Sequence, residues 1–220
     1  MAIIITAEVD VSRVDGEILR EVIARIQPRL QILANVLVPE VRSAIAVAMR
    51  NTPEYPQLLS GELQREFGLE DSAPVLDSVV AAVQESVRAT VLPPRGDYLG
   101  GVWLGAFRSD FSDALGASGA QYVSHSRRGS VLVPWLRWLL FEGDAVVLAE
   151  WGILRYVEEK FSRTGSHIMV RRKEGGKLAP WRVPPAFAGT KESNWLTKAA
   201  QLAARPIQDV IVREAQRILS

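Results

Sequence analysis

The chain has 220 residues, enough for one sizeable domain, and its 48% hydrophobic and 23% charged content is typical of an ordinary globular protein. It contains no cysteine and only two histidines, which excludes a disulfide framework, a thiolate metal site and a multi-histidine metal site. A net charge of +1 argues against nucleic acid as the main partner. No apolar run approaches the roughly 20 residues of a membrane span, and the N-terminus lacks the basic leader of a signal peptide. We therefore expect a soluble protein made in a cytoplasm, with no membrane partner.

The charge is distributed unevenly along the chain. Residues 51–90 carry seven acids against Arg65 and Arg88, a balance of −5, while residues 171–220 carry ten bases against four acids, a balance of +6. Oppositely charged segments in a nearly neutral chain favour pairing with a second copy or with neighbours. The alternative is that both segments are solvated faces, and the sequence leaves both interpretations open.

The first fifty residues predict a strand followed by a helical region. β-Branched residues within 2–9 indicate a short strand. From about residue 15 to residue 50, apolar residues recur at helical spacing, which indicates a helix with one wide buried face. Pro28 and Pro39 each remove a backbone donor, so we expect two or three helical pieces, with the main break at Pro39.

Shorter helices are expected next. A connecting loop with two prolines covers residues 51–61, and Gly68 closes a short helix over 61–68 in a left-handed conformation. A further helix is predicted over 72–86, with Ser72 as its cap.

The middle of the chain predicts strands and one aromatic helix. Pro134 begins that helix, which Gly143 closes. We expect residues 145–149 to pair with residues 153–158 as a hairpin. The other predicted strands are 87–92, 99–107, 120–125, 131–133 and 167–172.

The C-terminal segment predicts a final helix, capped by Asn194 and bent at Pro206. The whole pattern predicts an α+β fold, in which a mainly antiparallel sheet is flanked by N-terminal and C-terminal helices. We divide the chain into a strand and helical arm at residues 1–50 and an α+β domain at residues 51–220, which together form one structural unit.

No catalytic or cofactor site is predicted. The chain has neither a phosphate loop nor a Gly-x-Ser-x-Gly elbow, and its glycine pairs lack the spacing of a dinucleotide loop. Adjacent carboxylates such as Glu158 and Glu159 would point to opposite faces of a strand. We expect no enzyme activity, no metal and no cofactor. One alternative stays open: a small enzyme or nucleic-acid-binding module with a pocket around His125 or His167.

Basic and aromatic residues offer binding surfaces instead. Phosphate contacts need Lys and Arg, so DNA contact is physically admissible at the basic runs 127–128 and 171–173, although solvated hairpin tips would explain these runs as well. Aromatic side chains often anchor protein interfaces. Trp181 and Trp195 are the better anchor candidates because their flanks are polar or extended, whereas the core is expected to take Trp135, Trp138 and Phe141.

Three segments then occur in a characteristic order. The first is a proline-containing loop followed by Leu59-Ser60-Gly61-Glu62-Leu63, and the second is the aromatic segment Trp138–Gly143. The third, which is the most distinctive, combines Phe161–Met169, Trp181–Pro184, Phe187–Thr190 and Asn194–Ala199. In this order they resemble the tail-completion or neck (head-tail connector) proteins of tailed phages, from about residue 50 to the end. The first forty or so residues are longer than in the small members of that family.

The resemblance implies a virion structural protein that forms a closed ring of identical subunits between head and tail. Its neighbours would be a head connector or adaptor and a tail tube or terminator protein. A closed ring needs contacts between two different patches of each subunit, and we expect the acidic and basic segments to meet across subunits. The alternative within the same particle is a tail terminator that caps the tube. The candidate interface residues are Arg163, Arg171, Arg172, Lys173, Trp181, Trp195, Glu62, Glu66, Glu70 and Asp71, and the candidates for nonspecific contact with passing DNA are Arg127 and Arg128.

Overall fold

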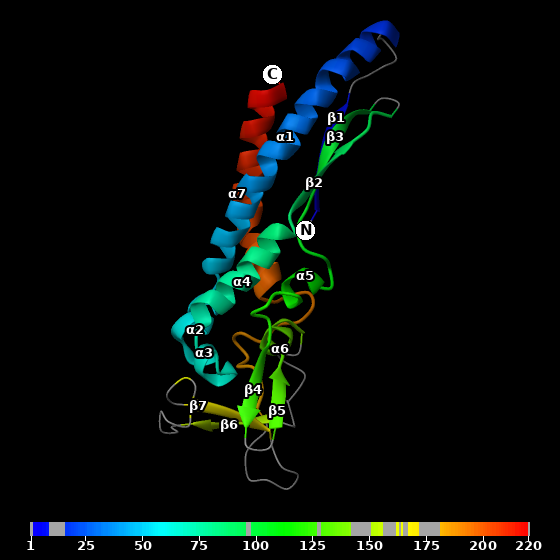
Figure 1. The fold of residues 1–220 in the computed structure, drawn as a ribbon. Helices are drawn as coiled ribbons and strands as arrows, with labels where there is room; N and C mark the ends of the chain where they lie inside the picture. Colours follow the sequence, from blue (N-terminus) through cyan, green and yellow to red (C-terminus); the bar gives the residue numbers. More distant parts are fainter. Residues whose placement is uncertain are drawn as a thin grey trace.

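The computed structural model describes residues 2–8, 16–95, 98–126, 129–141, 151–155, 162, 164, 167–171 and 181–219 (Figure 1). It confirms the expected α+β fold, with antiparallel sheets between N-terminal and C-terminal helices. The molecule is elongated: two long helices run along one half, and the shorter elements gather at the other end (Figure 1).

The long helices α1 (Gly16–Arg50) and α7 (Trp195–Leu219) pack side by side in opposite directions. One hydrogen bond at each end shows this: Nη1 of Arg29 donates to the carbonyl oxygen of Leu219 (3.1 Å), and Nε1 of Trp195 donates to that of Met49 (3.2 Å). Their buried sides are apolar at helical spacing, and each fully buried leucine contributes about 1.5–3 kcal/mol relative to exposure. These buried residues include Leu30, Leu33, Leu37, Val41 and Ile45 of α1, and Ala199, Ala203, Ile207 and Ile211 of α7.

The predicted break at Pro39 is wrong, because α1 continues through both prolines. A proline inside a helix costs about 3 kcal/mol through a lost hydrogen bond and a clash with the carbonyl four residues before it. Here Pro28 and Pro39 lie on the exposed side of α1, so water can solvate the freed carbonyls. Leu37 and Val41, on either side of Pro39, are 0% and 3% exposed, and their burial offsets the cost.

By length and composition alone, α1 could also cross a membrane, because it contains an 18-residue apolar window with at most two charged residues. The core helix of a soluble protein passes the same test, and nine α1 side chains are buried in this fold. The helix is therefore weak evidence for a membrane, and the absence of a membrane partner stays a prediction.

A three-stranded antiparallel sheet lies beside the first half of α1 (Figure 1). It consists of β1 (Ala2–Glu8), β2 (Arg88–Leu92) and β3 (Tyr98–Gly105) in the order β1-β3-β2, so β3 is central. α1 packs over β2 and β3. Val102 and Leu104 lie on the inner face of the sheet and are 0% and 3% exposed, whereas Trp103 between them lies on the outer face.

Three helices connect α1 to β2: α2 (Glu54–Ser60), α3 (Glu62–Phe67) and α4 (Ser72–Glu85). Gly68 closes α3 with φ 69°, as predicted. The prediction that Ser72 caps α4 is wrong: Asp71 occupies the cap position without a side-chain cap hydrogen bond. The Ser72 hydroxyl instead donates to the carbonyl oxygen of Leu59 (2.5 Å), which ties α4 to the end of α2.

The end of the molecule opposite the free ends of α1 and α7 holds two short strand pairs and an aromatic core. The helix α5 (Ser112–Leu115) leads to β4 (Tyr122–Ser126) and β5 (Gly129–Val133), which pair with each other and are followed by α6 (Trp135–Phe141). The strand β6 (Trp151–Arg155) pairs with β7 (His167–Arg171), so its observed partner differs from the predicted 145–149, which lies outside the described residues.

Asn194 caps α7, as predicted. Its Oδ1 accepts hydrogen bonds from the backbone N–H groups of Leu196 (3.0 Å) and Thr197 (3.1 Å). α7 continues through Pro206 to Leu219. α1 and α7 pack against each other in one apolar core.

Candidate functional site

The predicted basic cluster is only partly within the described residues. Arg163, Arg172 and Lys173 lie outside them, as do the DNA-proximal candidates Arg127 and Arg128. Arg171 is described: it is exposed at the end of β7, opposite Trp151 of β6.

The acidic candidates divide into buried and exposed groups. Glu66 is 1% exposed; its Oε1 accepts a hydrogen bond from Nη2 of Arg155 (2.6 Å), and its Oε2 accepts one from Nε1 of Trp181 (2.8 Å). Glu62, Glu70 and Asp71 are exposed on α3 and the corner that follows it. Glu66 therefore acts inside the chain, where it joins α3 to β6 and to the segment around Trp181, and only the other three carboxylates face solvent.

Both tryptophan candidates are buried within the chain. Trp181 is 6% exposed and packs edge-on against Phe67, with ring centroids 5.3 Å apart. Trp195 is 1% exposed and lies 6.5 Å from the ring of Tyr55. Neither ring is available to a partner in this conformation of the single chain, because each fills the core.

Acidic and basic segments already meet within one chain. Glu54, which is 0% exposed, accepts a hydrogen bond from Nζ of Lys198 (2.6 Å), so residues far apart in sequence are joined at the start of α7. A buried carboxylate left without its cation is costly, by roughly 3–5 kcal/mol. Part of the charge asymmetry therefore holds the fold together within one chain.

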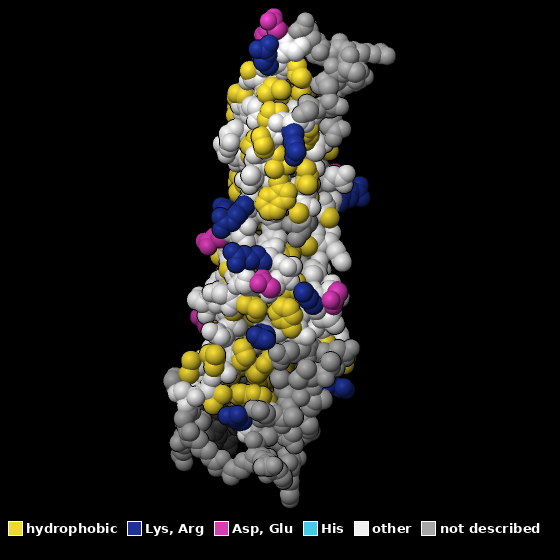
Figure 2. All heavy atoms as spheres, turned by 90° about the vertical axis from the view of Figure 1, so that its right-hand side faces the viewer, with side chains coloured by type: hydrophobic (Ala, Val, Ile, Leu, Met, Phe, Trp, Pro, Cys, Tyr) yellow, Lys and Arg dark blue, Asp and Glu magenta, His cyan; other side chains and the backbone are white. Residues whose placement is uncertain are grey.

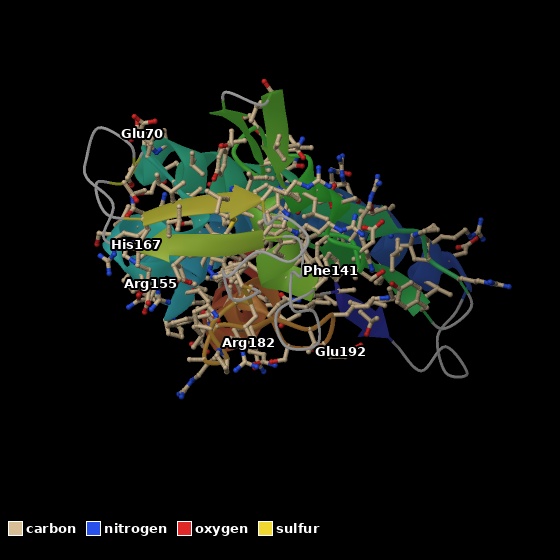
Figure 3. All side chains as sticks on the ribbon, turned by 90° about the horizontal axis from the view of Figure 1, so that it is seen from below. Glu70, Phe141, Arg155, His167, Arg182 and Glu192 are labelled. Carbon is tan, nitrogen blue, oxygen red and sulfur yellow. The ribbon has the colours of Figure 1, made fainter. Side chains whose placement is uncertain are left out.

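His167 lies at the same end of the molecule as Glu70 and Arg155 (Figure 3). It is 9% exposed and sits on β7 opposite Arg155 of β6. Burial lowers the pKa of His167 below 6.5, and the nearby positive charges of Arg65 and Arg155 lower it further, while Glu66 and Glu62 oppose the shift. His167 is thus held largely uncharged near neutral pH. The side chain of His125 lies outside the described residues.

The outer face of the three-stranded sheet is a partly apolar surface that the described residues leave open. Ile4 of β1 and Thr90 of β2 both lie opposite Trp103 of the central strand. Ile4 is 59% exposed, and Trp103 is half-buried. Figure 2 views the molecule from this side and shows hydrophobic side chains gathered along it, with scattered charges between them.

A hollow of about 510 Å³ lies at one end of this face. The Trp103 ring lies across Gly105, where any side chain would collide with it at about 2.2 Å. Arg88 and Arg108 stand at the rim of the hollow, and Phe107, with the unusual φ of 34°, forms part of its wall. A second hollow of about 500 Å³ shares Ser86, Arg88 and Asp113 with the first and continues along α4 and α5. Tryptophan and arginine are the residue types that most often dominate protein interfaces.

The sequence-based prediction missed this surface, because it names Trp181 and Trp195, and not Trp103, as the better interface anchors. The signal was present: Val102 and Leu104 flank Trp103 at strand spacing, and Gly101 and Gly105 leave room for its ring on the opposite face.

The described residues contain no group of three or more His, Asp or Glu side chains that could hold a metal ion. Comparison with protein families, with curated proteins and with solved structures found no match.

Proposed function

We propose that this chain is a structural subunit of a tailed phage particle, a neck or tail-completion protein that forms a ring and joins the head connector to the tail. The ordered segments between residue 50 and the C-terminus support this proposal through their resemblance to that family. The structural observation that carries it is the three-stranded sheet. Its outer face and both of its edge strands are uncovered in the described part of the chain, with Ile4 59% exposed.

A sheet of this kind favours assembly over catalysis. A soluble monomer rarely leaves a β-branched edge strand and an apolar sheet face open to water, because such surfaces associate. In the described part of the chain, helices and strands share one continuous apolar core, which can support this surface. A ring needs two different patches on each subunit, and the two edges of one sheet supply two such patches.

The test is the mass of the purified protein in solution by native mass spectrometry, together with its copy number in intact particles by quantitative proteomics. A ring of fixed size that is present in particles supports the proposal. Six copies in contact with the tail tube would favour the terminator, and twelve copies would favour the connector. A chain that stays monomeric and is absent from particles refutes it.

A further inference from the structure

Within the described part of the chain, both edges of the three-stranded sheet have backbone groups without a strand partner. β1 and β2 each pair with β3 on one side only. Among the described residues, no other backbone hydrogen bond joins residues 2–8 or 88–92 to a further strand. Each edge therefore offers a row of N–H and C=O groups to a partner strand.

The β1 edge lacks the features that usually protect an edge strand. Natural edges carry charged residues or proline, or are very short. β1 has seven residues, and its first six, Ala2–Ala7, contain neither a charge nor a proline. Its one charge, Glu8, and a shift in the pairing register lie at its last position. β2 is bounded by Arg88 and by the prolines that follow Leu92, but its centre, Ala89-Thr90-Val91, is uncharged. Both edges can therefore accept a strand without burying a charge.

The inner face of the sheet is incomplete at both edges. The central residues Val102 and Leu104 are fully covered, whereas Ile3 and Ile5 of β1 are only half-buried. Ala89 and Val91 of β2 are half-buried as well. Joining the two edges would bury the uncovered parts of these four apolar side chains, which favours association.

The strand directions suit a ring. β1 and β2 are both antiparallel to β3, so they run in the same direction. Rotation about an axis parallel to the strands preserves that direction, so β1 of one copy can pair in parallel with β2 of the next. Ile4 and Thr90 both lie opposite Trp103, and they would therefore meet at the same height.

We propose that β1 of one subunit pairs in parallel with β2 of a second copy of this chain, so that one sheet continues from subunit to subunit around the ring. This proposal rests on the proposed ring. In this arrangement Ile3 lies beside Ala89 and Ile5 beside Val91 of the next copy. The α1 helix of that next copy packs against its own β2, so it would lie beside the joined edge. The two-residue alternation of a strand fixes the pairing, because a shift by one residue would turn Ile3 and Ile5 outward.

The absence of cysteine allows a direct test by disulfide cross-linking. Ile4→Cys and Thr90→Cys each place one thiol on the outer face of an edge strand. Neighbouring strands lie about 4.8 Å apart, within the Cα–Cα range of about 4.4–6.8 Å that a disulfide needs. A mixture of the two single variants should give disulfide-linked heterodimers on oxidation, and the double variant should give a ladder of higher multimers. Each single variant alone should stay unlinked. Ser43→Cys, exposed on α1, is the matched control and should not link with either partner.

Hydrogen exchange of the wild-type chain gives a second readout that needs no substitution. The amides of residues 2–8 and 88–92 should exchange more slowly in the assembled ring than in the dissociated chain. A ring that forms without heterodimer cross-links and without this protection refutes the strand pairing and leaves the proposed function standing. If the Ile4→Cys variant alone forms disulfide-linked dimers, the β1 strands of two copies meet in a two-fold contact, and the proposed pairing of β1 with β2 is wrong. If the heterodimer cross-links form but the protein is absent from phage particles, the strand pairing stands and the proposed phage function is refuted.

Discussion

Replacing Glu66 by glutamine tests whether this buried carboxylate holds the end of the molecule that contains α3 and β6. Glutamine has the shape of glutamate but offers one acceptor oxygen instead of two. It therefore cannot accept hydrogen bonds from both Arg155 (2.6 Å) and Trp181 (2.8 Å), and one of these donors faces the amide N–H₂ group.

The expected loss follows from the two contacts. A hydrogen bond to a charged group contributes about 1.5–3 kcal/mol, and an unpaired buried donor costs about 1–3 kcal/mol. The Arg155 side chain is 52% exposed, so solvent screens its attraction to Glu66 and the lower half of the range applies. We expect Glu66→Gln to lower the free energy of unfolding by about 2 kcal/mol. For a chain of this length that corresponds to about 4–8 °C in Tm.

The assay is urea and thermal unfolding followed by tryptophan fluorescence, because Trp138 and Trp181 pack against each other near Glu66. Glu62→Gln is the matched control. Its carboxylate lies 3.5 Å from the same Arg155 but is 49% exposed, so its loss should change stability by no more than about 0.5 kcal/mol. Equal effects of the two variants would show that burial does not decide the contribution of Glu66, and the reasoning would fail.

Three further predictions concern the helix cap, the histidine and the sheet. Asn194→Ala removes the oxygen that accepts two backbone N–H groups of α7, and chemical denaturation should show a loss of about 1 kcal/mol, against little change for exposed Ser193→Ala. Because the pKa of His167 is lowered in the folded chain, the unfolded chain binds more protons, and the free energy of unfolding should fall as the pH drops below about 6.5. His167→Gln should flatten this pH dependence in unfolding curves measured between about pH 5 and 7. An unchanged pH dependence in the variant would contradict the assigned cause. Ile4→Lys places a charge on the exposed edge strand, so native mass spectrometry should show loss of the ring while the Tm stays close to that of the dissociated wild-type chain, and a ring of normal mass would exclude this edge from the interface.

The elements that the sequence predicts correctly are those whose signals are local. Apolar spacing and a capping asparagine are enough to place α7, and a glycine in the left-handed region is enough to end α3. The pairing of β6 with β7 could not be predicted from local signals, because strand pairing depends on which distant segment the fold places beside a strand. α1 does not break at Pro39, because the burial of Leu37 and Val41 outweighs the local tendency of proline to end a helix.

The candidate site was harder to predict than the fold. Charge patterns cannot separate a carboxylate that holds the core together, such as Glu66, from one on the surface, such as Glu70, since both occur in the same acidic segment. The outward position of the half-buried Trp103 could have been predicted from strand alternation. Trp195, in contrast, lies against a distant part of the chain, where its Nε1 donates to the carbonyl oxygen of Met49, 146 residues away in sequence.

The paired long helices also set the length of one half of the subunit (Figure 1). The 35 residues of α1 extend about 52 Å, and α7 is tied to it near both ends, through Arg29 and Leu219 at one end and Met49 and Trp195 at the other. The two helices therefore cannot slide past each other, and inserting a turn into one alone would separate one of these pairs. In a stack of rings, this pair of linked helices would keep constant the thickness of the part of each ring that the helices span. Only matched changes in both helices would alter that thickness.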